Sequence, residues 1–241
     1  MKNICFPRRY DRNYQTIDDA EQQRLFRARV AVVGCGGLGG YIAEELARLG
    51  VGCLVLIDGD RHEETNLNRQ LTATEDTLGS LKVLAAQERL AQVNSNVVVE
   101  AHTEHLTSNN AGSFLAGVDL VMDALDSISA RLMLEQACED LSIPLIFAAI
   151  DGWYGMLGVD LPGDRHMAML YGSAKENRDT PLSNPAFTPA VIASLAVAES
   201  IKVLLGKPLS LLHAWLQVDL FNMTFDQIRF PVAEDAEARS D

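Results

Sequence analysis

Cysteine is scarce in this sequence, and its placement excludes the usual sites built from it. The 241 residues include four cysteines, all far apart. None forms a C-x-x-C pair, so we expect no tetrahedral zinc site of the usual spacing. Disulfides are not expected in a chain of this size in the reducing cytosol. The four free thiols would be Cys5, Cys35, Cys53 and Cys138.

Positive charge is also in short supply. Lys and Arg number 20 against 33 Asp and Glu, which gives a formal net charge of −13. Nucleic-acid partners demand clustered Lys and Arg against the phosphate backbone, so this balance argues against them. It does not argue against a single nucleotide, which a few local cations and a metal ion can hold.

Long uninterrupted apolar runs are missing as well. The longest apolar stretch, residues 189–205, is broken by Ser194, Glu199, Ser200 and Lys202. It therefore predicts a buried helix and not a membrane span. Residues 1–9 carry basic side chains but no long apolar segment of the kind found in signal peptides. We expect a cytoplasmic protein with no membrane partner.

Strand and helix patterns alternate over the first 150 residues. Strands are predicted at residues 30–33, 53–57, 97–101, 120–122 and 145–150. Helices are predicted at residues 18–27, 38–49, 81–93, 109–115 and 129–141. This alternation predicts an α/β fold with a Rossmann-like, doubly wound sheet that is mainly parallel.

The pattern changes in the C-terminal part. Strands are predicted at residues 156–161, 213–219 and 224–230, the last two as an antiparallel pair. A helix at 190–205 would end at Gly206. The polar residues 164–184 predict a long surface loop. We expect residues 1–241 to form a single domain, with an N-terminal arm at 1–28, a crossover loop at about 162–189 and a frayed tail at 233–241.

A strand that runs into a glycine-rich turn is the most informative segment. Residues 30–33 precede the run Gly34-Cys35-Gly36-Gly37-Leu38-Gly39, and a predicted helix follows. Such glycines let the backbone approach a phosphate chain, and the helix N-terminus supplies N–H donors. The next strand ends at Asp58, an acid placed to take a ribose hydroxyl. This unit predicts a nucleotide site, and alone it would fit an NAD(P) or flavin enzyme equally well.

The residues after Asp58 separate these possibilities, because a dehydrogenase does not need them. They are Asp60, Asn66, Arg69, Gln70 and Lys82. The planar fork of Arg69 and the compact charge of Lys82 suit a triphosphate. Two further acids, Asp123 and Asp126, follow the fourth strand, and carboxylates beside polyphosphate commonly hold Mg²⁺.

Six motifs in this order resemble those of the MoeB/ThiF/HesA family, the bacterial relatives of ubiquitin-activating enzymes. They are Arg9-Tyr10-Asp11-Arg12, the glycine run, Asp58-Gly59-Asp60, Asn66-Leu67-Asn68-Arg69-Gln70, Gly79-Ser80-Leu81-Lys82 and Asp123-Ala124-Leu125-Asp126. The resemblance spans about residues 9–230. It implies an adenylyltransferase that uses ATP and Mg²⁺ to activate the C-terminal Gly-Gly carboxylate of a small ubiquitin-like sulfur-carrier protein. Molybdopterin, thiamine or a related sulfur-transfer pathway would use the product.

The resemblance also implies roles for single residues. ATP would be bound by Gly34, Gly36, Gly37, Gly39, Asp58, Asp60, Asn66, Arg69, Gln70, Lys82 and Asp123. Catalysis would rest on Arg12, Arg69, Lys82 and Asp126. Within these sets Asp58 would hold the ribose, and Asp126 would help to place Mg²⁺. Arg12 would reach the ATP of the partner subunit, which implies a homodimer.

Two departures from the family limit what carries over. Members with structural zinc carry two C-x-x-C pairs, and members that form a thioester or persulfide use a cysteine in the crossover loop. This sequence has neither pair and no cysteine in residues 162–189. We therefore expect adenylation without covalent transfer, with sulfur supplied by a separate donor protein. The five histidines show no ligand spacing and are expected to coordinate no metal.

Simpler roles remain open for several of these residues. Asp126 could cap the following helix, Asp123 could be structural, and Lys82 or Arg12 could be plain surface cations. Trp153 and Tyr154 are expected to pack, although a substrate tail would pass beside them. Rival functions are a tRNA-modifying ATP-dependent dehydratase, a peptide-adenylating enzyme of the same fold, a non-catalytic subunit that binds a ubiquitin-like protein, and an NAD dehydrogenase.

Overall fold

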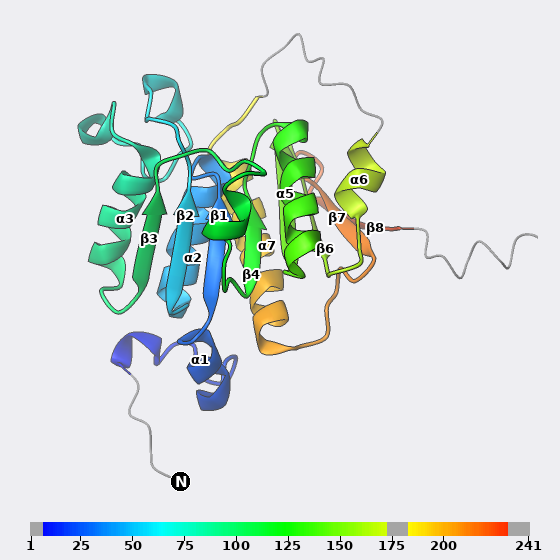
Figure 1. Cartoon of the computed structure of the whole chain (residues 1–241), viewed down its shortest axis with the longest axis horizontal. Helices are drawn as coiled ribbons and strands as arrows, with labels where there is room; N and C mark the ends of the chain where they lie inside the picture. Colours follow the sequence, from blue (N-terminus) through cyan, green and yellow to red (C-terminus); the bar gives the residue numbers. More distant parts are fainter. Residues whose placement is uncertain (1–6, 173–182, 231–241) are drawn as a thin grey trace, which may run out of the picture.

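A computed structural model describes residues 7–172 and 183–230, and it shows one mixed β-sheet with helices on both faces (Figure 1). The sheet has 8 strands in the order β3-β2-β1-β4-β5-β6-β7-β8. The strands are β1 Arg29–Val33, β2 Cys53–Ile57, β3 Val98–His102, β4 Leu120–Asp123, β5 Leu145–Asp151, β6 Tyr154–Asp160, β7 Ala214–Asp219 and β8 Thr224–Arg229. The helices are α1 Asp19–Leu25, α2 Gly37–Leu49, α3 Lys82–Val93, α4 Ala111–Phe114, α5 Ile128–Leu141, α6 His166–Tyr171 and α7 Phe187–Leu205.

The direction of the strands confirms the predicted sheet. Strands β1 to β5 pair in parallel, whereas β6, β7 and β8 are added antiparallel. The carboxyl ends of β1, β2, β4 and β5 therefore meet at one edge of the sheet. Strand β6 runs the other way, so its last residue, Asp160, pairs with Leu145 at the start of β5. That residue lies at the opposite edge.

Alternation along each strand divides the core between the two faces of the sheet. In β1, Val30 and Val32 pack with α2, α3 and α7, whereas Ala31 and Val33 pack with α4 and α5. All four of these side chains are at most 1% exposed. The parallel strands are thus covered on both faces, as parallel sheets usually are.

Helix α7 confirms the prediction of a buried helix. It is long and apolar enough by composition to cross a membrane. Its residues Ile192, Ala193 and Ala196 are fully buried in the core against the sheet and α2. The apolar composition is therefore used in packing within this fold. The helix begins at Phe187, three residues before the predicted start.

The prediction of a continuous loop at residues 164–184 is wrong, because α6 lies within it. Met167 is fully buried and packs with Phe147 and Phe230, so one turn of this polar segment has an apolar anchor. The Glu135 carboxylate also accepts hydrogen bonds from the backbone N–H groups of Met167 and Ala168, at 2.8 and 3.1 Å. A helix end satisfied by a distant side chain leaves no local signal in the sequence. The predicted frayed tail and part of the crossover lie outside the described residues.

Residues 7–28 of the N-terminal arm are packed against the body of the protein. The Tyr10 hydroxyl accepts a hydrogen bond from Asn94 at 2.7 Å, and its ring lies 5.1 Å from that of Phe26. The Gln22 amide donates to the carbonyl of Leu49, the last residue of α2. Figure 1 shows the arm and α1 beyond the edge where β1 begins. The described part of the arm therefore lies at the amino end of β1, whereas the glycine run lies at its carboxyl end.

Candidate functional site

The glycine run folds into a tight loop between β1 and α2. Gly34 has φ +92°, and a Cβ added there would lie 2.6 Å from the Ala124 carbonyl oxygen. A Cβ on Gly39 would lie 1.8 Å from the carbonyl oxygen of Gly34. Both positions therefore exclude every other residue type. The loop leads into a helix of 13 residues whose N-cap, Gly36, has no side-chain cap. Such an N-terminus offers N–H groups to a phosphate.

Asp58 holds this loop in place from the end of β2. Asp58 is only 8% exposed. One carboxylate oxygen accepts a hydrogen bond from the backbone N–H of Cys35 at 2.7 Å, and the other accepts one from Asp60 at 2.7 Å. The predicted ribose acid thus sits at the carboxyl edge, beside the loop. Any contact with a ribose would use the remaining lone pairs of its two oxygens.

Lys82 and Asp60 form an ion pair at the same edge. The Lys82 ammonium lies 2.8 Å from an Asp60 carboxylate oxygen. The hydrogen bond from Lys82 lowers the pKa of Asp60 from its ordinary value. Lys82 is 8% exposed and is the first residue of α3, so it is not a plain surface lysine. An isolated bridge between Arg61 and Leu81 holds the two segments together.

The segment around Asn66 brings amide and guanidinium groups against the glycine loop. The Asn66 side chain accepts from the Glu63 backbone N–H at 3.0 Å and so closes the turn. A Cβ on Gly36 would lie 3.5 Å from the Gln70 amide nitrogen, and one on Gly37 would lie 3.8 Å from Arg69 Cγ and Cδ. The buried amide oxygen of Gln70 has no hydrogen-bond partner within the described part of the chain. The Gln70 amide nitrogen and the Arg69 side chain beside the glycine loop give a cradle with donors that suits a phosphate-bearing ligand.

Asp123 supports the next loop and is turned inward. It is 1% exposed, and its oxygens accept from the Leu125 backbone N–H at 2.9 Å and from Arg131 at 2.8 Å. Burial raises the pKa of Asp123, although the Arg131 charge opposes that shift. Arg131 also donates to the carbonyl oxygens of Ala148 and Leu125. These contacts match the structural role that the sequence left open for Asp123, and they identify Arg131, which sequence reasoning missed.

Asp126 stands exposed at the end of that loop. The alternative that Asp126 caps α5 is wrong, because Ser127 is the N-cap and accepts from the Ala130 backbone N–H at 3.3 Å. The carboxylate is therefore not used as the helix cap. It projects from the loop that touches Gly34 through Ala124. Its position suits a ligand to a metal ion that accompanies a polyphosphate.

Arg12 lies away from this edge of its own chain. It is exposed within the N-terminal arm, before β1 begins, whereas the glycine loop follows the end of β1. A strand rises about 3.3 Å per residue, so β1 alone separates them by at least about 13 Å. Arg12 therefore lies out of reach of the glycine loop of its own chain.

The expected burial of the thiols of Cys35 and Cys138 is confirmed. Cys35 and Cys138 are buried. Burial raises the pKa of the Cys35 thiol well above its ordinary value and that of Cys138 to about 12. Burial also raises the pKa of the half-buried Cys53. Cys5 lies outside the described residues.

The aromatic pair after β5 is more exposed than packing alone requires. Trp153 and Tyr154 keep 46% and 51% of their surface accessible. The Trp153 ring contacts Phe187 at 4.5 Å and Phe221 at 5.7 Å between centroids. Trp153 lies on the segment that joins β5 to β6, and Tyr154 is the first residue of β6, at the same edge as the glycine loop. The predicted packing role therefore accounts for only part of this surface.

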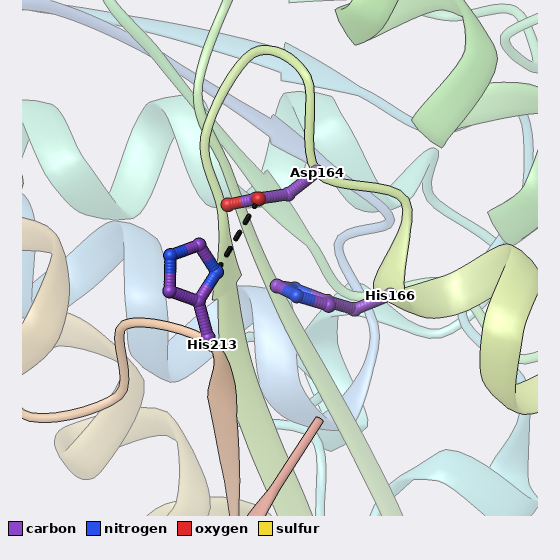
Figure 2. A group of neighbouring side chains, drawn as sticks. All are labelled: Asp164, His166 and His213. Carbon is purple, nitrogen blue, oxygen red and sulfur yellow. Dashed lines mark ion pairs between the residues drawn. The ribbon is translucent and has the colours of Figure 1, made fainter. Parts of the chain in front are cut away.

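Two groups of side chains in the described residues have the composition of metal sites. Asp58, Asp60 and His105 lie together at the carboxyl edge. Asp164, His166 and His213 form the second group, at the opposite edge (Figure 2). The contacts of Asp58 and Asp60 are accounted for by the backbone and by Lys82. The histidines were not expected to meet because 47 positions, 213 minus 166, separate the two in the second group.

Comparison with known proteins is consistent with this geometry. The sequence profile of the ThiF family matches residues 10–238. A sulfur carrier protein adenylyltransferase of Thermus thermophilus is 38% identical over 230 residues, covering 89% of this chain and 85% of the relative. The SAMP-activating enzyme E1 of Haloferax volcanii is 31% identical over 218 residues, covering 89% and 81%. The fold matches E. coli MccB crystallised with ATP, with a TM-score of 0.79 at 23% identity over 93% of this chain and 72% of that one.

Proposed function

Because the chain belongs to the ThiF family, we propose that it uses ATP and Mg²⁺ to adenylate the C-terminal Gly-Gly carboxylate of a small ubiquitin-like sulfur-carrier protein. One observation carries the proposal. The glycine loop, Arg69, Lys82 and Asp126 converge on a single edge of the sheet. A relative with 38% identity is named as an adenylyltransferase of a sulfur carrier protein, which agrees with this reaction.

The reaction is the attack of a carboxylate oxygen on the α-phosphorus of ATP. The new bond joins the carboxylate to AMP, and the bond from the α-phosphorus to pyrophosphate breaks. This chemistry requires positioning of the two anions and neutralisation of their charge, with little covalent work by the protein. Bound Mg²⁺ would neutralise phosphate charge and orient the leaving group.

The protein side chains divide this task. Backbone N–H groups at the start of α2 would face the phosphates, and Arg69 and Lys82 would offset their negative charge. The Lys82 ammonium donates a hydrogen bond to Asp60, which fixes its orientation before ATP binds. Asp126 would hold Mg²⁺. Asp123 and Arg131 would act one step away by fixing the loop that carries Asp126.

The nucleoside end would lie nearer to Asp58. Its carboxylate, already bonded to two backbone N–H groups, would also accept a ribose hydroxyl. Asn66 and Gln70 would complete the phosphate side, where the Gln70 amide nitrogen lies against the glycine loop and can donate to a phosphate oxygen. The substrate tail would pass the exposed Trp153 and Tyr154. These assignments leave no role for a nicotinamide cofactor.

Two further features complete the proposal. Arg12 cannot reach its own site, so it would serve the site of a partner subunit in a homodimer. No buried cysteine of the described chain is poised as a nucleophile, so the product would be the acyl-adenylate. A separate sulfur donor protein would then convert that adenylate to a thiocarboxylate.

The test is ATP–pyrophosphate exchange with a purified carrier protein ending in Gly-Gly. Exchange should require the carrier, its intact terminus and Mg²⁺. We expect Lys82→Met to lower the exchange rate by about 10²- to 10³-fold, since it removes a charge that faces the transferred phosphorus. Lys207→Met, which removes a lysine paired with Glu21 at the surface, should have no effect on the rate.

Nucleotide binding gives an independent measurement. MgATP at 100 times its dissociation constant should stabilise the fold by about 2.7 kcal/mol, and NAD⁺ should not stabilise it. Stabilisation by NAD⁺ alone would refute the adenylation proposal. MgATP binding without carrier-dependent exchange would instead support the non-catalytic subunit.

A further inference from the structure

We propose that Asp164, His166 and His213 bind one divalent transition-metal ion, at the edge of the sheet opposite the glycine loop. The three come from different elements. Asp164 lies in the turn after β6, His166 is the first residue of α6, and His213 immediately precedes β7. Figure 2 shows the three side chains converging on one point. The proposal is independent of the reaction at the nucleotide edge.

The distances between the ligand atoms suit a single ion. One ligand atom from each residue lies within 4.8 Å of the other two. The Asp164 carboxylate oxygen is 3.5 Å from His213 Nδ1. Two atoms each about 2.1 Å from one ion at a tetrahedral angle lie about 3.4 Å apart. The Asp164–His213 pair is therefore already at coordination spacing, and a ligand atom of His166 lies within 4.8 Å of both.

His166 is held as metal-ligating histidines usually are. It is 4% exposed, and its Nδ1 lies 2.5 Å from a carboxylate oxygen of the buried Asp160. Phe230 stacks on the ring at 3.8 Å between centroids. A carboxylate on one ring nitrogen fixes the orientation of the ring and makes the other nitrogen, Nε2, a better ligand. Figure 2 shows the ring directed from α6 toward the other two side chains.

Negative charge is in excess around this point. Asp160 and Glu135 are 4% and 2% exposed, and the second oxygen of Asp160 is buried with no hydrogen-bond partner among the described residues. Burial and the neighbouring Asp160 carboxylate raise the pKa of Glu135. Arg165 offsets part of this charge, at 3.6 Å from Glu135. A bound cation would offset the remainder.

The composition of the group selects the kind of ion. Two imidazoles and one carboxylate suit Zn²⁺, Co²⁺ or Ni²⁺, whereas Mg²⁺ and Ca²⁺ prefer oxygen ligands throughout. The side chains of His213 and Asp164 are 42% and 17% exposed. Solvent can therefore enter and complete the coordination sphere. The ion would join the start of α6 to the start of β7.

The experiment uses the untagged full-length chain carrying Cys5→Ala, stripped with a chelator and titrated with Co²⁺ at about pH 8, since an alkaline pH favours the deprotonated imidazoles that bind metal. We expect one Co²⁺ per chain, a visible absorption band typical of nitrogen and oxygen ligands, and displacement by one Zn²⁺. His213→Ala should weaken binding by about 100-fold or more. Asp164→Asn should weaken it by at least about tenfold.

A matched control removes the histidine of the other group. His105→Ala should leave Co²⁺ affinity and stoichiometry unchanged, and Zn²⁺ should raise the melting temperature of this variant but not of His213→Ala. Both substituted histidines are substantially exposed, so both variants should fold. The proposal fails if the parent chain carrying only Cys5→Ala binds no stoichiometric Co²⁺. It also fails if His105→Ala abolishes binding or if His213→Ala leaves it intact, because the ion would then lie elsewhere or the three side chains would form ion pairs only.

Discussion

Gly39, which ends the glycine run, and the adjacent Gly40 tolerate an added methyl group very differently. At Gly39 a Cβ would lie 1.8 Å from the Gly34 carbonyl oxygen, whereas at Gly40 the nearest atom is 3.6 Å away. Both positions are in α2 and both are buried. The pair therefore separates the demands of the loop from those of the helix.

We predict opposite effects for the two alanine substitutions. Gly39→Ala should destabilise the protein by about 1–3 kcal/mol and abolish measurable ATP binding, because the loop must move to admit the methyl group. Gly40→Ala should keep ATP binding and raise stability by about 0.5–1 kcal/mol through helix propensity. Urea unfolding and ATP titration check both. Equal loss of ATP binding in the two variants would show that the loop geometry is not what matters.

Buried thiols give a second prediction at the residue scale. A nucleophilic thiolate must be accessible and have a lowered pKa, but burial raises the pKa of Cys138 to about 12. We expect ATP–pyrophosphate exchange to persist in Cys5→Ala and after alkylation of exposed thiols. No thiol-sensitive adduct of enzyme and carrier should appear on a non-reducing gel. An adduct lost on mutation of one cysteine would reverse this conclusion.

The sequence predicted where the site residues lie better than what each one does. Short motifs place Asp58 and Asp126 at the carboxyl edge because each follows a parallel strand, and Lys82 reaches this edge from the start of α3. The inward turn of Asp123 depends on Arg131, which lies eight residues later on α5. A pair of that kind is visible in a sequence only once the packing is known. For the same reason, the meeting of His166 with His213 could not be predicted.

At the scale of elements, Glu44 ties α2 to α3. Its carboxylate pairs with Arg89 of α3 and with Arg48 one turn later in α2, and only 9% of the side chain is exposed. Burial alone would raise the pKa of Glu44, but the hydrogen bonds from both arginines outweigh burial and lower it. Helix α2 starts at the glycine loop and α3 starts at Lys82. This ion pair therefore braces the two helices that carry the phosphate-binding groups.

The lowered pKa fixes the direction of a pH effect. Ionised Glu44 contributes stability at pH values above its unfolded pKa, near 4.5, and this contribution is lost as the pH falls through the lower folded value. We expect Glu44→Gln to cost about 1–3 kcal/mol near pH 7. The difference in the free energy of unfolding between this variant and the unsubstituted protein, measured by urea titration, should shrink as the pH falls below 4.5. A difference that stayed constant would mean that Glu44 acts through packing and not through charge.

Helix α6 shows where periodicity stops being informative. Strands and long helices carry their apolar pattern over many residues, so their order and type were predicted correctly along the described chain. Helix α6 has six residues, and its N-terminus is satisfied by Glu135 of α5. Short elements of this kind are stabilised by contacts that the local sequence does not encode.

At the scale of the whole molecule, Arg12 makes assembly testable. Arg12 precedes β1 and the glycine loop follows it, so under the proposed role of Arg12 a complete site needs two chains. Arg12→Ala and Arg69→Ala should each lower exchange strongly without unfolding the protein. Mixing the two variants should restore up to about a quarter of the original activity. Half of the dimers are then mixed, and each mixed dimer has one site with both arginines.

The control for mixing is a pair that cannot complement. A chain carrying both substitutions, mixed with Arg69→Ala, gives no site with both arginines and should stay inactive. Subunit exchange is confirmed by mass spectrometry of differently labelled chains. Confirmed subunit exchange without recovery of ATP–pyrophosphate exchange activity would place Arg12 outside the site of the partner.

The position of β1 also bears on how the chain is made. β1 lies between β2 and β4, and Val30 pairs with both Leu54 and Leu120. While the ribosome has delivered only β1 to β3, one side of β1 is an open edge. The face of β1 that packs against α7 is also uncovered until that helix, which begins at Phe187, has been made.

Ribosome-bound chains stalled before α7 emerges should therefore be cleaved readily by added protease, and chains extended beyond residue 230 should resist. Equal resistance of the two would mean that the N-terminal half closes its core alone. Otherwise, the strand that opens the nucleotide loop stays incompletely covered for most of its synthesis, since α7 is among the last elements translated.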